Sequence, residues 1–198
     1  MEKKMKRLVS VLLVLLLLVG CGGGAPANNP KSVAQAFLNA LRSGDAEKVM
    51  EMTAPSQRGD EDSIDIMDMD VKDEKLVKEF TGKFFKDGFK VTDVTEEGDS
   101  AVANITFSAP KMGELMGKLM PVIFAKAFDE DYNALTEEEQ GMEMMKIMTD
   151  SLKDATFDTY ESKLHLIKED DKWYAEALDG KNEDMLEIIF DDFNIFGE

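Results

Sequence analysis

The only histidine of the chain, His165, is the side chain best suited to carry a proton near neutral pH. A two-residue turn at residues 170–171 places His165 opposite Glu176 on neighbouring strands, with Tyr174 on the same face. A carboxylate beside an imidazole orients the ring and favours its charged form, so these residues form a candidate pocket for general-base chemistry. The alternative is a solvated cross-strand ion pair worth about 0.2–1 kcal/mol. No nucleophile or oxyanion motif accompanies the pair, and we therefore expect no enzyme activity.

Methionine is concentrated in one part of the chain. Seven of the fourteen methionines lie between residues 112 and 148. Thioether side chains repack easily, so they can line an apolar groove for a lipid, a peptide or a partner helix. They can also bind Cu(I). The interpretation that we favour is that they simply fill a core. The candidate interaction surface consists of Met112, Met116, Met120, Met145 and Met148.

Metal binding has weak support in the sequence. With one His and one Cys, the chain lacks a His/Cys ligand set, and we expect no cofactor. The acidic run Asp129–Asn133, followed by Glu137, begins like a calcium-binding EF-hand loop. However, Ala134 occupies the position where that loop needs Gly, and Gln140 the position of its bidentate Glu. We interpret the run as an acidic loop that leads into a helix cap at Thr136, with calcium binding as the alternative.

The N-terminal residues have the layout of a secretory signal, a basic start followed by a short apolar run. The run is shorter than the roughly 20 residues of a membrane span. It ends in Leu18-Val19-Gly20-Cys21, which resembles the lipobox of bacterial lipoproteins. The resemblance implies a signal peptide over residues 1–20, cleavage before Cys21, lipidation of the Cys21 thiol and a location on the extracytoplasmic face of the cell membrane. An ordinary signal peptide and a single anchoring helix are the alternatives.

The charge of the chain excludes some partners. The formal net charge is -18, and it becomes -21 without residues 1–20. Phosphate backbones and anionic headgroups repel such a chain, so we expect no nucleic-acid partner and no basic patch for membrane attachment. Attachment would depend on the lipid at Cys21.

The remaining sequence predicts a flexible tether over 21–30 and one α+β domain over 31–198. Its apolar periodicities predict helices over 32–41, 45–52, 73–86, 112–128, 136–152 and 182–193, and strands over 89–96, 101–109, 156–168 and 172–178. Ser32 is the predicted N-cap of the first helix, and the turn at 170–171 pairs Glu169 with Lys172 and Leu166 with Ala175. The fold class is therefore N-terminal helices packed on a curved four-stranded antiparallel sheet, with a helical insertion over 111–154 between the two hairpins.

Two stretches carry a family resemblance: VAQAFLNALRSGDAEKVMEMTAP at 33–55 and LHLIKEDDKWYAEALDG at 164–180. They resemble small bacterial lipoproteins of the nuclear transport factor 2-like (cystatin-like) superfamily, over about residues 30–109 and 155–180. The resemblance implies a conical roll with a pocket at its open end, and it implies no single function.

From these observations we expect a lipid-anchored extracytoplasmic module that binds an unknown protein or a small hydrophobic ligand without catalysis. Two alternatives stay open. One is an enzyme with a pocket in the cone of the sheet that uses His165 and Glu176, and the other is a calcium-dependent binding module.

Overall fold

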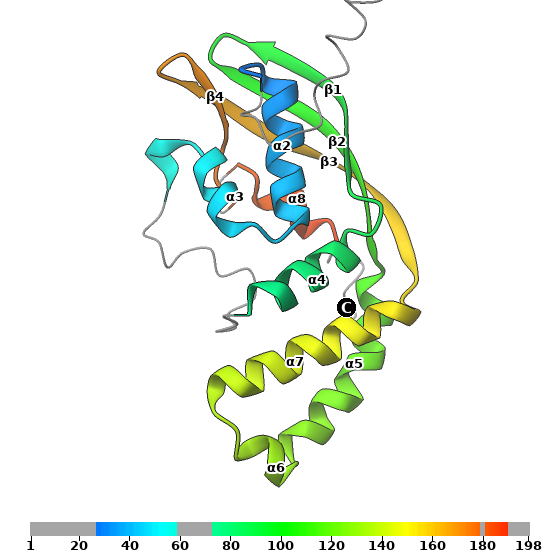
Figure 1. Ribbon diagram of the computed structural model, residues 1–198. Coiled ribbons are helices and arrows are strands. Elements are labelled where there is room, and N and C mark those ends of the chain that lie inside the picture. Colours follow the sequence, from blue (N-terminus) through cyan, green and yellow to red (C-terminus); the bar gives the residue numbers. More distant parts are fainter. Residues whose placement is uncertain (1–26, 59–72, 179–180, 190–198) are drawn as a thin grey trace, which may run out of the picture.

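The computed structural model describes residues 27–58, 73–178 and 181–189, and these residues form an α+β fold. Helices pack on a four-stranded antiparallel sheet with the strand order β1-β2-β3-β4 (Figure 1). The predicted signal peptide, Cys21 and the start of the tether lie outside the described residues.

The helices and strands follow the predicted order. The helices are α2 (Pro30–Arg42), α3 (Ala46–Met52), α4 (Glu74–Phe84), α5 (Met112–Ala127), α6 (Glu130–Asn133), α7 (Glu137–Ser151) and α8 (Glu183–Glu187). The strands are β1 (Phe89–Glu97), β2 (Ser100–Pro110), β3 (Phe157–Glu169) and β4 (Lys172–Ala175), and short 3-10 turns occupy Pro55–Gln57 and Leu152–Asp154.

The first described helix begins earlier than predicted. Asn29 replaces Ser32 as the N-cap of α2, because the Asn29 side-chain oxygen accepts a hydrogen bond from the Ser32 N–H at 2.9 Å. The preceding Asn28 donates to the Asp171 carbonyl at 2.7 Å and accepts from the Trp173 N–H at 3.0 Å. The last residues of the predicted tether are therefore bonded to the β3–β4 hairpin.

The predicted register of the last hairpin is confirmed. Glu169 pairs with Lys172 and Leu166 pairs with Ala175. Asp170 and Asp171 form the two-residue turn with φ of 47 and 61, the left-handed conformation that such hairpin turns require. β4 ends at Ala175, earlier than the predicted residue 178, so β3 has no strand partner beside residues 157–164 on this side.

The core lies between α2 and one face of the sheet. Alternate residues of β2, from Ala101 to Ala109, are at most 2% exposed, as their period-2 spacing predicts. On the helix side, Phe37 and Leu38 of α2 are 0% exposed. A row of aromatic rings extends this core toward α4, and it consists of Phe80, Phe84, Phe85, Phe89, Phe107 and Tyr160.

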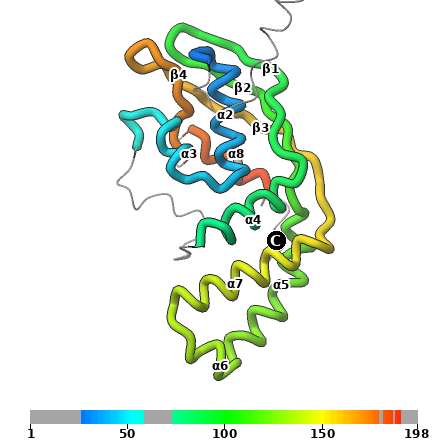
Figure 2. The backbone as a smooth tube through the Cα atoms, in the orientation of Figure 1, coloured from blue at the N-terminus to red at the C-terminus, as the bar shows by residue number. Residues whose placement is uncertain are grey.

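The predicted insertion forms a helical arm, residues 112–151, that projects from one end of the sheet (Figures 1 and 2). α5 continues through Pro121, and the segment predicted as a loop at 129–133 contains the short helix α6. Near the base of the arm, α7 packs against α4, and Met145 and Thr149 of α7 are 5% and 3% exposed. The end of the arm at α6 lies far from α2, where the described chain begins (Figure 1).

Candidate functional site

The predicted pair of His165 and Glu176 is joined through the backbone. The Glu176 N–H donates to the His165 carbonyl at 3.0 Å, as the register requires. The Glu176 side chain is 4% exposed, and its carboxylate accepts a hydrogen bond from Lys181 at 3.0 Å. No hydrogen bond or ion pair joins the imidazole to this carboxylate in the part of the chain that the structure describes. Tyr174 pairs in register with Ile167 and does not line the pocket that contains His165.

Asn182 completes the sheet where β4 ends. Its side-chain oxygen accepts from the His165 N–H at 2.7 Å, and its amide nitrogen donates to the carbonyls of His165 at 3.1 Å and Glu176 at 2.8 Å. The carboxamide thus acts as a peptide group in the place of the missing strand. Asn182 is 1% exposed, and it precedes α8 directly. Its bonds hold α8 beside β3.

A pocket of about 360 Å³ lies between β3 and α8. It is lined by Lys163, His165, Lys181, Asp184 and Glu187, together with Ser162 and Ile188. Lys163, Lys181, Asp184 and Glu187 give this lining charged groups of both signs, which can bind a small charged molecule. The structure thus confirms that Glu176 lies opposite His165 on the neighbouring segment, but of the three residues of the predicted site only His165 lines this pocket.

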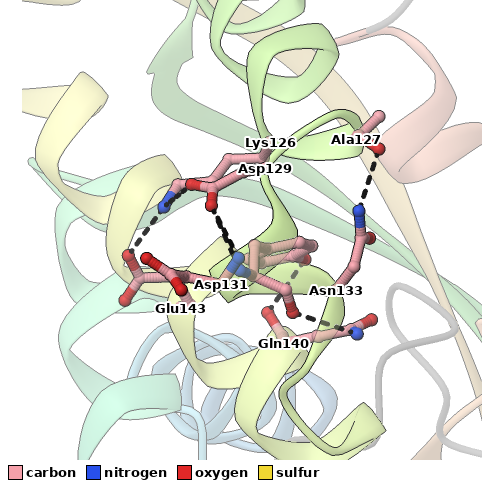
Figure 3. A network of polar contacts seen from close by, with 8 residues as sticks. Lys126, Ala127, Asp129, Asp131, Asn133, Gln140 and Glu143 are labelled. Carbon is pink, nitrogen blue, oxygen red and sulfur yellow. Dashed lines mark hydrogen bonds and ion pairs between the residues drawn. The ribbon is translucent and has the colours of Figure 1, made fainter.

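The acidic run at 129–133 forms the turn between α5 and α7 (Figure 3). One carboxylate oxygen of Asp129 accepts from the backbone N–H groups of Asp131 at 3.1 Å and Tyr132 at 3.3 Å, which makes Asp129 the N-cap of α6. Asn133 donates to the Ala127 carbonyl at 3.1 Å. Within the described ranges, no group of three or more His, Cys, Asp or Glu side chains is arranged to hold a metal ion.

Lys126 joins the three helices of the arm. Its ammonium lies 3.4 Å from Asp129 and 3.6 Å from Glu143 of α7 (Figure 3). Burial acts to lower the pKa of Lys126, but the two carboxylates outweigh burial and hold this pKa above its ordinary value. The pKa of Asp129 is lowered, first because the Tyr132 N–H donates to its carboxylate, with Lys126 adding to the effect. The turn is therefore held by a set of mutually paired groups.

The predicted helix cap at Thr136 is confirmed as a complete capping box. The Thr136 hydroxyl accepts from the Glu139 N–H at 3.3 Å, and the Glu139 carboxylate accepts from the Thr136 N–H at 2.9 Å. The Thr136 backbone N–H is the largest cause that lowers the pKa of Glu139, followed by the Thr136 hydroxyl.

We expect Glu139→Gln to lower thermal stability at neutral pH and to matter less in acid. Because the pKa of Glu139 is lower in the folded chain than its ordinary value of 4.5, its contribution is present above that value and is lost as pH falls through the folded pKa. Thermal unfolding followed by circular dichroism from pH 7 to pH 3 measures this. The Tm difference between wild type and variant should narrow toward pH 3. The control is Glu137→Gln, which removes a carboxylate from the same helical turn but outside the capping box. A Tm difference between wild type and Glu139→Gln that does not change with pH would contradict a stabilising role of the ionised Glu139 carboxylate.

The predicted methionine surface is only partly at the surface. Met112 and Met145 are 8% and 5% exposed and belong to the hydrophobic core. This corrects their assignment to an interaction surface. Met116, Met120 and Met148 are half-buried. Two of the five methionines therefore fill the core, and the other three are only partly accessible.

Large exposed apolar side chains lie instead at the far end of α5. Among the residues that the structure describes, these are Val122, Phe124 and Phe128, which are 39%, 58% and 85% exposed. Neither Phe124 nor Phe128 belongs to the interaction surface predicted from the sequence. Their spacing of four, in line with Met116 and Met120, was the available signal, but it does not tell an exposed row from a buried one.

The fold and these surfaces define an α+β protein with a helical arm. In the described part of the chain, no helix combines the length and apolar character needed to cross a membrane. The comparison with protein-family models finds no match, and the comparison with curated proteins finds none either.

One solved structure is similar, a SEC-C motif containing protein from Rhodopseudomonas palustris. Its sequence is 12% identical, the match covers 77% of this chain and 79% of that chain, and the TM-score is 0.39. A similarity at this level carries no argument about function.

Proposed function

We propose that the protein is a lipid-anchored extracytoplasmic module that binds another protein through the helical arm and catalyses no reaction. The observation that carries the proposal is a pair of exposed aromatic side chains, Phe124 of α5 at 58% exposure and its C-cap Phe128 at 85%. Exposed apolar patches mark interaction sites, and aromatic residues contribute much of the binding energy at interfaces.

The construction of the arm supports this proposal. Lys126 ties α5 to Asp129 and to Glu143 of α7, and Gln140 donates from its side chain to the carbonyls of Tyr132 and Leu135. An ordered arm presents Phe124 and Phe128 without the entropy cost of ordering a loop on binding. The arm also lies at the end of the molecule opposite α2 (Figure 1), so attachment near the N-terminus leaves it accessible.

The lipid anchor and the resemblance to nuclear transport factor 2-like lipoproteins are part of the proposal. The lipobox-like residues 18–21 support the anchor, and the order of helices and strands supports the family resemblance in outline. The expected result for the anchor is incorporation of labelled palmitate into the wild-type chain in a bacterial host and none into Cys21→Ser. If Cys21→Ser remained membrane-bound, or if the wild type stayed unlabelled, the anchor would be wrong.

Protein binding through the arm is tested by photocrosslinking in cells. A photoreactive phenylalanine analogue is placed at position 128 of the full-length chain, and a control carries it at the exposed position 95 of β1. We expect a discrete protein adduct from position 128 only. Equal adducts from both positions, or none from position 128, would contradict binding through the arm.

A second candidate function is the binding of a small charged molecule between β3 and α8. The pocket there, lined by Lys163, His165, Asp184 and Glu187, favours it. Native mass spectrometry of the purified protein decides between the two candidates: a retained small-molecule adduct supports the pocket, and its loss in Lys163→Ala would place the molecule there.

A further inference from the structure

The exposed side of α5 has a regular pattern of rows. One row, with a spacing of four, holds large apolar residues that become more exposed toward the far end: Met116, Met120, Phe124 and Phe128. The neighbouring row holds small residues that are all exposed: Gly113, Gly117, Pro121 and Ala125. A Cβ built on Gly117 would meet no atom within 4 Å. The surface is therefore a ridge beside a shallow groove.

A ridge beside a groove with a spacing of four is the surface that helices use to pack on one another. The small residues let a second backbone approach closely, while Phe124 and Phe128 supply area to bury. In addition, Pro121 has no N–H to donate to the Gly117 carbonyl one turn earlier. The Gly117 carbonyl therefore lacks its usual donor four residues later in the helix.

The charge around this surface is one-sided. Residues 122–143, the arm tip, contain seven carboxylates and one lysine. The lysine, Lys126, is already paired with Asp129 and Glu143. Glu130, Asp131 and Glu137 are exposed, and Glu130 and Asp131 follow Phe128 in the chain by two and three residues. The surface is complementary to a partner that combines an apolar face with positive charge.

We propose that the occupant of this surface is a cationic amphipathic helix of a partner protein. Its apolar face lies along Phe124 and Phe128, and its Lys or Arg side chains face Glu130, Asp131 and Glu137. This inference rests on the proposed function and specifies its partner. A second copy of the chain is disfavoured because two arm tips carry the same charge in a chain of net charge -18. Anionic lipid is disfavoured for the same reason.

The test uses synthetic helical probes on the full-length protein in nanodiscs of zwitterionic lipid, with empty nanodiscs as the reference on a biosensor. The first probe is a Leu/Lys amphipathic peptide of about 18 residues, or five turns. The second keeps the Leu face and carries Glu in place of Lys. The third has the composition of the first in a scrambled order that destroys the apolar face.

We expect only the first probe to bind. The variant Phe124→Ser/Phe128→Ser should weaken its binding about 30-fold, because exposed aromatic anchors are typical hot spots. The variant Glu130→Gln/Asp131→Asn should weaken it about threefold. The control Glu96→Gln/Glu97→Gln, which removes the same charge from β1, should leave the binding unchanged. All variants are checked for an unchanged Tm.

Several results would overturn this inference. Equal binding of the scrambled peptide would show simple charge attraction, and binding of the Glu peptide would remove the role of charge. No binding of the first probe, or dimers in analytical ultracentrifugation that Phe128→Ser abolishes, would exclude this occupant. If position 128 still forms a protein adduct in cells, then the proposed function stands and only the partner class is wrong.

Discussion

Replacing Phe107 by Ala is expected to lower the free energy of unfolding by about 3–5 kcal/mol. Phe107 is 2% exposed and lies in the middle of the aromatic row. Its ring centroid is 6.0 Å from that of Phe85, 5.1 Å from Phe89 and 5.7 Å from Tyr160. These contacts join β2 to β1, β3 and the end of α4, so the cavity left by Ala is surrounded by residues of four elements and cannot close easily.

Urea denaturation measures this change, and an unchanged m-value shows that the comparison is valid. The matched control is Phe124→Ala, which removes the same atoms from a side chain that is 58% exposed. We expect the control to stay within about 0.5 kcal/mol of the wild type. If Phe107→Ala and Phe124→Ala lower the free energy of unfolding by the same amount, the aromatic row is not a close-packed core. Phe107→Leu, which fills more of the space, is expected to fall between Phe107→Ala and the wild type.

The predictions from sequence that were confirmed depend on neighbours in the chain. The hairpin register at Glu169 and Lys172 follows from a two-residue turn, and the capping box at Thr136 follows from a residue three positions away. The buried face of β2 follows from strict alternation. Each pattern contains both of its partners within a few residues, so the sequence alone specifies the contact.

The features that were missed depend on distant contacts. Asn182 bonds to the backbone of His165, 17 residues earlier, and nothing in the residues around Asn182 indicates a substitute for a strand. Met145 and Phe128 both belong to apolar helical patterns, but α4 covers the first and nothing among the described residues covers the second. Which apolar face is buried is decided by where other helices pack, and periodicity alone cannot supply that.

The two candidate binding surfaces, the pocket at His165 and the exposed side of the arm, have different structural origins. The pocket at His165 exists because β4 is short and Asn182 holds α8 beside the unpaired part of β3. The arm surface exists because α5 buries one side, including Leu115 and Leu119 at 3% and 1% exposure, and leaves Phe124 exposed on another. The first depends on sheet topology, and the second on helices that extend beyond their packing partners. Variants of one surface should therefore leave the other intact.

Replacing Gly44 by Ala is expected to destabilise the protein through two separable effects. Gly44 has φ +62, a conformation that costs a residue with a Cβ about 1–2 kcal/mol. A Cβ there would also lie 2.9 Å from Thr81 Oγ1 and 3.2 Å from the Lys78 backbone. Thr81 cannot move freely because its hydroxyl donates to the Val77 carbonyl at 3.0 Å, so we expect a further cost of about 1–3 kcal/mol from overpacking.

Gly98 provides the matched control. It has φ +63, and a Cβ there would meet no atom within 4 Å, so Gly98→Ala reports the conformational cost alone. The difference in unfolding free energy between Gly44→Ala and Gly98→Ala therefore isolates the contact between the α2–α3 turn and α4. A large difference would show that this turn holds α4 closely, and α4 is the helix on which α7 and the base of the arm rest. Equal losses of unfolding free energy in the two variants would mean that the turn moves away from α4 to make room for the Cβ. The position of α4, and with it the base of the arm, would then depend on the aromatic row rather than on the N-terminal helices.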